Sequence, residues 1–137
     1  MAGQRTDRAA PIPATVAELL EQARRQLDRL QPAAALAASR NDAVIVDIRP
    51  EEQRRSDGEI SGAVVVQRNV LEWRLDPQCP DRDPELATPG RRVILVCNEG
   101  YQSSLAAATL RGFGVDATDV VGGVQAWRAE GLPLERP

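Results

Sequence analysis

Histidine and lysine are both missing from this chain of 137 residues, so all 17 basic residues are arginine. Without histidine, the chain cannot build a Ser–His–Asp triad, a Cys–His dyad or a histidine metal site. Without lysine, it has no residue for a Schiff base and no P-loop lysine. Any nucleophile in this chain must therefore be activated by other groups.

Cysteine is almost as scarce, because the chain holds only Cys79 and Cys97. Two cysteines cannot form a disulfide framework or a four-thiolate zinc site within one chain. We therefore expect a protein that uses no metal and no cofactor.

Long apolar runs and a strong charge of either sign are also absent. The net charge is −3 and the isoelectric point is about 5.0, so we expect neither nucleic acid nor a membrane as a partner. The start "MAGQRTDRAAPIPAT" lacks the apolar core of a signal peptide. We expect a cytoplasmic protein with a flexible segment over residues 1–14 and a single domain over residues 15–137.

Short apolar runs separated by helical stretches predict the fold class. The runs are nearly continuous, which is typical of strands buried on both faces. The predicted strands are Asp42–Pro50, Ala63–Val66, Arg91–Cys97 and Ala117–Val121. Strands alternating with helices indicate an α/β fold with a mostly parallel central sheet and helices on both faces.

The stretch Thr15–Leu30 predicts a helix ahead of the first strand. Thr15 and Glu18 have the spacing of a capping box. Its apolar residues recur at helical spacing, which favours a packing helix. Whether this helix completes the core or docks a partner stays open. Further helices are predicted after Gln31, within residues 68–77, from Ser103 or Ser104 to Gly112 or Gly114, and after Gly122.

Cys97 stands at the joint between the third predicted strand and the helix that follows it. In a parallel sheet, ligands bind at the carboxyl ends of the strands, where the next helices begin. Free N–H groups, the helix dipole and converging loop amides supply partial positive charge there. These groups favour a thiolate over a thiol and would also hold a bound anion or a persulfide. A small buried core cysteine is the alternative.

Three stretches of the sequence together resemble the rhodanese (thiosulfate sulfurtransferase) family. "VDIRPEEQRRSDGEISGAVVV" (Val46–Val66) is similar to the family's Asp-x-Arg strand end and its Gly-x-Ile-x-Gly-Ala turn. "VILVCNEGYQSSLAAATL" (Val93–Leu110) resembles the active-site strand, loop and helix. "VVGGVQAW" (Val120–Trp127) resembles the closing Gly-Gly-x-x-x-Trp segment. The resemblance covers about residues 32–133 and implies a single rhodanese-like α/β domain.

The resemblance implies a sulfurtransferase in which Cys97 is the nucleophile. Sulfane sulfur would pass from a donor, thiosulfate or a persulfide, to Cys97 and then to a thiol or cyanide acceptor. A partner protein that carries a persulfide is an alternative donor. The amides of the loop would stabilise the charge on the persulfide. This anion-binding loop comprises Asn98, Glu99, Gly100, Tyr101, Gln102 and Ser103.

Loop length separates this sequence from phosphatases and arsenate reductases, which share the fold. Their loop is one residue longer and is closed by an arginine, which would fall at position 103. Ser103 occupies that position, so the bidentate guanidinium needed for phosphoryl transfer is missing. We expect the Ser103 hydroxyl to cap the helix rather than to bond the persulfide.

The loop also departs from that of the best-known sulfurtransferases, which often carries basic residues. Here Glu99 lies in the loop, and Gln102 stands where an arginine is frequent. A carboxylate that points inward repels a dianion, so a protein persulfide or a small thiol persulfide becomes the alternative to thiosulfate as donor.

Several residues are predicted near the pocket rim. Arg68 and Trp73 lie in a segment that runs there by resemblance, and Arg68 would supply positive charge. Arg49 is a further rim candidate, although a structural ion pair with Asp47 is the favoured interpretation. Two rival functions stay open: a non-catalytic sulfur carrier or binding module, and a thiol redox sensor that pairs Cys97 with Cys79.

Overall fold

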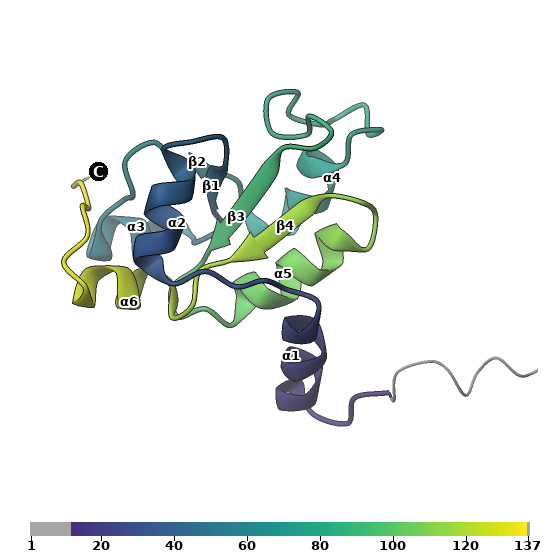
Figure 1. Ribbon diagram of the computed structural model, residues 1–137, viewed down its shortest axis with the longest axis horizontal. Coiled ribbons are helices and arrows are strands. Elements are labelled where there is room, and N and C mark those ends of the chain that lie inside the picture. The colour runs from purple at the N-terminus through teal and green to yellow at the C-terminus, as the bar shows by residue number, and fades with distance from the viewer. Residues whose placement is uncertain (1–11, 137) are drawn as a thin grey trace, which may run out of the picture.

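The structure is a computed structural model that describes residues 12–136. Most of the predicted flexible segment, residues 1–14, lies outside the described residues. A four-stranded sheet of β1 (Val44–Asp47), β2 (Val64–Val65), β3 (Arg92–Val96) and β4 (Asp116–Asp119) forms the centre (Figure 1). Its order is β2-β1-β3-β4, and every pairing is parallel. The predicted α/β fold is therefore confirmed.

Helices cover both faces of the sheet (Figure 1). The helical elements are α1 (Val16–Arg25), α2 (Pro32–Ser39), α3 (Glu51–Asp57), η2 (Arg68–Val70), α4 (Leu71–Leu75), α5 (Gln102–Arg111) and α6 (Gly123–Ala129). Alternate residues of β1 and β3 point to opposite faces. One face packs against Leu71, Leu75, Ala106 and Leu110 of α4 and α5, and the other against Ala35, Val124 and Trp127 of α2 and α6.

The second predicted strand is not buried on both faces. β2 lies at the edge of the sheet, and Val65 is 40% exposed. An apolar run of valines looks the same in a central strand and in a short edge strand, so only the pairing distinguishes them. The short helix predicted within residues 68–77 is present as η2 followed directly by α4, which ends at Leu75.

Helix α1 begins as predicted but ends early. The Thr15 side chain accepts a hydrogen bond of 3.1 Å from the N–H of Glu18, as the capping spacing predicts. The helix stops at Arg25, because Leu30 pairs with the sheet instead: its N–H donates to Asp119 and its carbonyl accepts from Val121. The packing prediction holds only in part, since Ala23 is buried whereas Val16 is 74% exposed.

Candidate active site

Cys97 follows the last residue of β3, and its sulfur is surrounded by backbone donors. The N–H groups of Gly100 and Ser103 donate to Cys97 Sγ at 3.2 and 3.3 Å. The residue is only 7% exposed. Two N–H groups aimed at one sulfur stabilise negative charge on it and on an atom bound to it. The structure thus places Cys97, for which the sequence predicts a nucleophilic role, in a loop whose N–H groups converge on its sulfur.

Backbone packing between the loop and the start of α6 fixes this geometry. Gly100 has φ +88°, and a Cβ atom there would lie 2.8 Å from the nitrogen of Gly122. A Cβ on Gly123 would lie 2.5 Å from the carbonyl oxygen of Cys97. That carbonyl accepts from the N–H of Val124 at 2.9 Å. Glycine is required at these positions because the two backbones touch and φ is positive.

A pocket of about 370 Å³ opens in front of Cys97. Loop residues Asn98, Glu99, Tyr101 and Gln102 line it together with Ile48, Arg49, Pro50, Gln53 and Arg68. The structure therefore brings most of the predicted site residues together. Gly100 and Ser103 are buried and contribute their backbone amides.

The arginines of this pocket are already paired with carboxylates. Arg49, which is 1% exposed, binds the Asp47 carboxylate through Nη2 at 2.8 Å and also donates to the Gly58 carbonyl. Arg68 binds Glu72 at 2.9 Å. The side chain of Glu99 is exposed and lines the pocket. Two internally neutralised arginines and one free carboxylate make the pocket poorly suited to a small dianion.

The Ser103 hydroxyl neither caps α5 nor faces the sulfur. It donates to Asp119 Oδ2 at 2.7 Å, and α5 begins at Gln102 with no side-chain cap. Ser104 donates to the same oxygen at 2.8 Å. The capping prediction for Ser103 is wrong, because the hydroxyl binds the buried carboxylate of Asp119 at the end of β4 instead of an N–H group at the start of α5.

These features agree with the comparison against protein families. The family of rhodanese-like domains matches residues 31–130, which is most of the chain. The chain belongs to the rhodanese-like domain family. A comparison with curated proteins found no match.

Several solved structures share the fold of this chain. A protein of unknown function from Rhodopseudomonas palustris, named as a possible tyrosine phosphatase, is 32% identical, with a TM-score of 0.82 over 93% of this chain and 98% of that one. A rhodanese-related protein from Thermoplasma volcanium is 20% identical, with a TM-score of 0.64 over 80% of this chain and 98% of that one. A thiosulfate sulfurtransferase from Pseudomonas aeruginosa is 23% identical, with a TM-score of 0.64 over 80% of this chain and 19% of that one.

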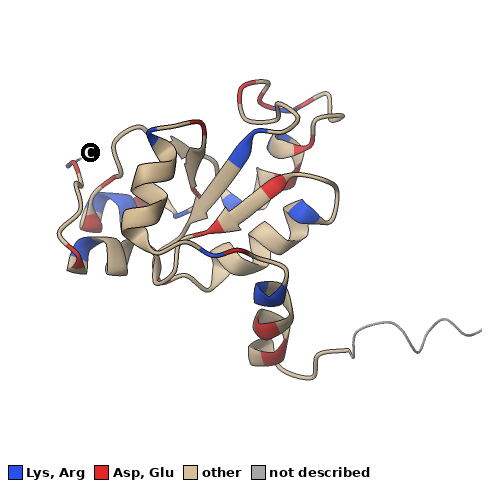
Figure 2. Cartoon of the chain, viewed as in Figure 1, with Lys and Arg blue, Asp and Glu red and all other residues tan. Residues whose placement is uncertain are grey.

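A second layer of polar contacts holds the loop from outside the matched rhodanese-like region. Arg24 Nη2 and Arg29 Nη2 both donate to the Gly100 carbonyl, at 2.8 and 3.1 Å. Arg24 Nε also donates to Ser104 Oγ at 3.1 Å, and Arg29 Nε binds Asp119 at 2.8 Å. The Gly100 carbonyl faces these groups while the Gly100 N–H faces the sulfur. Figure 2 shows that the basic end of α1 is the end nearest the body of the molecule.

Sequence reasoning missed Arg24, Arg29 and Asp119. The two arginines precede the family motifs, and a helix with charges on one face is usually only solvated. For Asp119 the sequence does indicate that a partner exists, because a carboxylate inside a buried apolar strand needs one. Nothing in the sequence indicated which arginine would provide it.

The structure does not bring Trp73 or Cys79 to the Cys97 pocket. Both line a different hollow, together with Phe113, and Trp73 is 55% exposed. The prediction of Trp73 at the rim is therefore wrong, because α4 turns this side chain away from the loop. Cys79 and Cys97 are both free thiols, and no lining residue is common to their two pockets.

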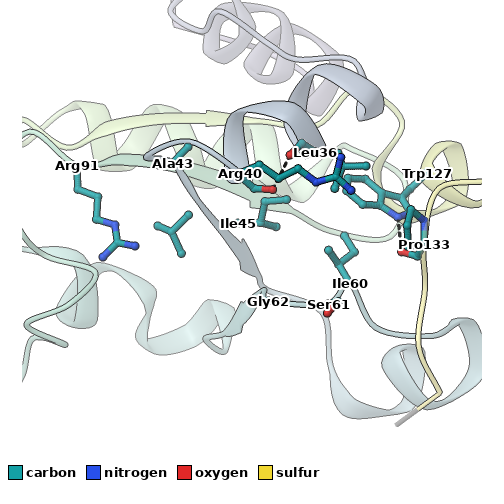
Figure 3. A pocket seen from close by; sticks show the side chains of 12 residues that line it. Leu36, Arg40, Ala43, Ile45, Ile60, Ser61, Gly62, Arg91, Trp127 and Pro133 are labelled. Atoms are coloured by element: carbon teal, nitrogen blue, oxygen red, sulfur yellow. Dashed lines mark hydrogen bonds between the residues drawn. The ribbon is translucent and has the colours of Figure 1, made fainter.

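Another pocket of the rhodanese-like domain, of about 380 Å³, lies among α2, β1 and Trp127 (Figure 3). It shares no lining residue with the Cys97 pocket. Within residues 12–136, no cluster of three or more Cys, Asp or Glu side chains is arranged to hold a metal ion. No helix of this described part is long and apolar enough to cross a membrane.

Proposed function

We propose that this rhodanese-like protein is a sulfurtransferase that carries sulfane sulfur as a Cys97 persulfide. The observation that carries the proposal is the pair of N–H groups, from Gly100 and Ser103, directed at Cys97 Sγ on the floor of an open pocket. Backbone dipoles perform the task that histidine performs in other thiol enzymes, and the chain has no histidine.

The reaction has two displacement steps. In the first, the Cys97 thiolate attacks the sulfane sulfur of a donor, a new Sγ–S bond forms, and the donor bond breaks with its electrons on the leaving group. That leaving group is sulfite from thiosulfate or a thiolate from a persulfide. In the second, an acceptor thiolate or cyanide attacks the outer sulfur, and the electrons of the Sγ–S bond return to Cys97. The loop amides stabilise the charge in both steps.

Pocket charge favours a persulfide over thiosulfate as the donor. Arg49 and Arg68 are neutralised by Asp47 and Glu72, and Glu99 adds a negative charge. A thiol persulfide carries less charge at its reacting end than thiosulfate does, so it loses less binding energy here. A cytoplasmic location, where small thiols are abundant, is part of this proposal.

Intact mass spectrometry of the reduced protein tests the proposal. After exposure to thiosulfate or to a small thiol persulfide, the wild type should gain one sulfur atom, and Cys97→Ser should gain none. Cys79→Ser is the matched control, because it removes the other thiol and should load normally. Sulfur on Cys79, or no adduct with any donor, would contradict the proposal.

The same samples separate the rival functions. A non-catalytic carrier would load Cys97 but transfer the sulfur to cyanide no faster than a free persulfide does. A redox sensor would form a Cys79–Cys97 disulfide under mild oxidant. The two thiols line separate pockets, and this argues against a disulfide between them and against a resolving role for Cys79.

A further inference from the structure

A groove of about 460 Å³ continues from the Cys97 pocket towards α3 and the segment before α4. The two hollows share Ile48, Arg49, Pro50 and Arg68 as lining residues, so they form one continuous cleft. The Cys97 pocket alone has room for an ion as small as thiosulfate. The adjoining groove has room for the body of a larger thiol whose sulfur lies at Cys97.

The groove is lined by one arginine, Arg54, whose charge is not offset by a carboxylate of the described residues. Arg54 is half-buried and donates through Nη1 to the Arg49 carbonyl at 2.7 Å. Among residues 12–136, no carboxylate lies within ion-pair distance of Arg54. The carboxylate of Glu51, which also lines the groove, is bound by Arg55 at 2.8 Å.

Arg68 stands where the two hollows meet, but Glu72 already offsets its charge. It binds Glu72 through Nη1 only, at 2.9 and 3.0 Å. Its Nε is buried and donates to no acceptor among the described atoms. A buried N–H group cannot reach a ligand in the cleft, so Arg54 is the groove cation that is available to a carboxylate.

We propose that the groove binds the carboxylate of a cysteine-derived thiol, through Arg54, while the thiol sulfur meets the outer sulfur on Cys97. This inference rests on the proposed function and names the class of its acceptor. The acceptor thiolate forms a bond to the outer sulfur, the Sγ–S bond breaks, and its electrons return to Cys97. The acceptor leaves as a carboxylate-bearing persulfide, and no further oxidant or reductant is needed.

Discharge of the loaded protein tests this selectivity. Cys97 persulfide is prepared, freed of donor and mixed with glutathione, glutathione diethyl ester or 2-mercaptoethanol, and loss of the sulfur atom is followed by mass spectrometry. Arg54→Gln should lower the second-order rate constant for glutathione about tenfold, as expected for a lost charge-assisted hydrogen bond. The rate constants for the ester and for 2-mercaptoethanol should stay within twofold, and Arg54→Lys should restore part of the loss.

Arg82→Gln is the matched control, because it removes one exposed positive charge outside both hollows. If Arg54→Gln and Arg82→Gln discharge to glutathione at equal rates, the groove assignment is wrong while the persulfide chemistry stands. If Cys97 never loads, the proposed function fails, and the groove is then tested by calorimetry with S-methylglutathione on the unloaded protein. Binding that is about tenfold weaker in Arg54→Gln supports the groove, and equal affinity overturns it.

Discussion

Glu99 is the single residue whose charge most directly meets an anionic donor. It is exposed at the Cys97 pocket, and the two arginines of that pocket are held by carboxylates. Glu99→Gln should therefore raise kcat/KM for thiosulfate, with cyanide as acceptor, about threefold at low ionic strength. Thiocyanate formation measures the rate.

Added salt and a second variant, Glu130→Gln, provide the controls for Glu99→Gln. The gain should shrink as salt is added, because an exposed charge is screened over about 8 Å at 0.15 M. Glu130→Gln removes a carboxylate that is also exposed but lies outside the pocket, and it should change little. A gain that persists unchanged at high salt would show that the Glu99 charge is not its cause.

Gly123 should be intolerant of any side chain. A Cβ there would lie 2.5 Å from the carbonyl oxygen of Cys97 and 2.6 Å from that of Asn98, at φ +62°. We expect Gly123→Ala to cost about 3 kcal/mol or more in the free energy of unfolding and to abolish Cys97 loading. Denaturant titration and intact mass measure the two effects.

Gly90→Ala is the control for Gly123→Ala, because it measures the cost of backbone strain without a steric clash. Gly90 has φ +83° with open space around its Cβ position, so alanine there should cost only about 1 kcal/mol. Equal costs at the two positions would mean that the loop moves aside from the Gly123 side chain.

Single residues could be predicted where their role is local in the sequence. Cys97 and the loop from Asn98 to Ser103 could be predicted from one strand–loop–helix stretch together with its resemblance to the rhodanese family, and the structure places most of them around the pocket. The Ser103 hydroxyl could not be predicted, because its acceptor is Asp119, which lies on another strand. The prediction for Trp73 was wrong because the orientation of α4, which directs this side chain to another hollow, is not visible in the local sequence.

At the scale of elements, α1 acts on the loop through Arg24. Its guanidinium donates to the Gly100 carbonyl and to Ser104 Oγ, and it lies 5.7 Å from the centre of the Tyr101 ring. We expect Arg24→Gln to lower kcat for sulfur transfer about tenfold and to change KM less than twofold. The reason is that the oriented amides stabilise charge that develops during transfer.

Arg25→Gln is the neighbouring control for Arg24. Arg25 is exposed and, within the described residues, pairs with Glu21, one turn earlier on the same helix. Its substitution should leave kcat and KM unchanged, and both variants should load one sulfur per chain. If Arg24→Gln lowers only the loaded fraction, and not kcat of the loaded protein, its role is in folding rather than in positioning.

The existence of most elements was predictable, but the end of α1 was not. Helical spacing of apolar residues continues to Leu30. The chain leaves the helix after Arg25 because Leu30 gains two backbone hydrogen bonds beside β4. That pairing joins residues far apart in the sequence, and local periodicity carries no information about it.

The fold of the whole molecule followed from the alternation of strands and helices, but the fold does not choose the chemistry. Both sulfurtransferases and a possible tyrosine phosphatase are among the solved structures that resemble this chain. Two features favour sulfur transfer over phosphoryl transfer. Residues 97–103 of the loop contain no arginine, and the pocket residues Arg49 and Arg68 are bound by carboxylates.

Phosphate-ester hydrolysis should therefore be absent. Binding of a phosphoryl dianion requires a guanidinium that is free to form two parallel hydrogen bonds. We expect Cys97-dependent hydrolysis of p-nitrophenyl phosphate to fall at least about a thousandfold below sulfur transfer, on the scale of removing several kcal/mol of transition-state stabilisation. Vanadate should not slow the loading of Cys97. Hydrolysis that disappears in Cys97→Ser, or protection of Cys97 by vanadate, would show that the pocket accepts a phosphoryl group and would contradict this prediction.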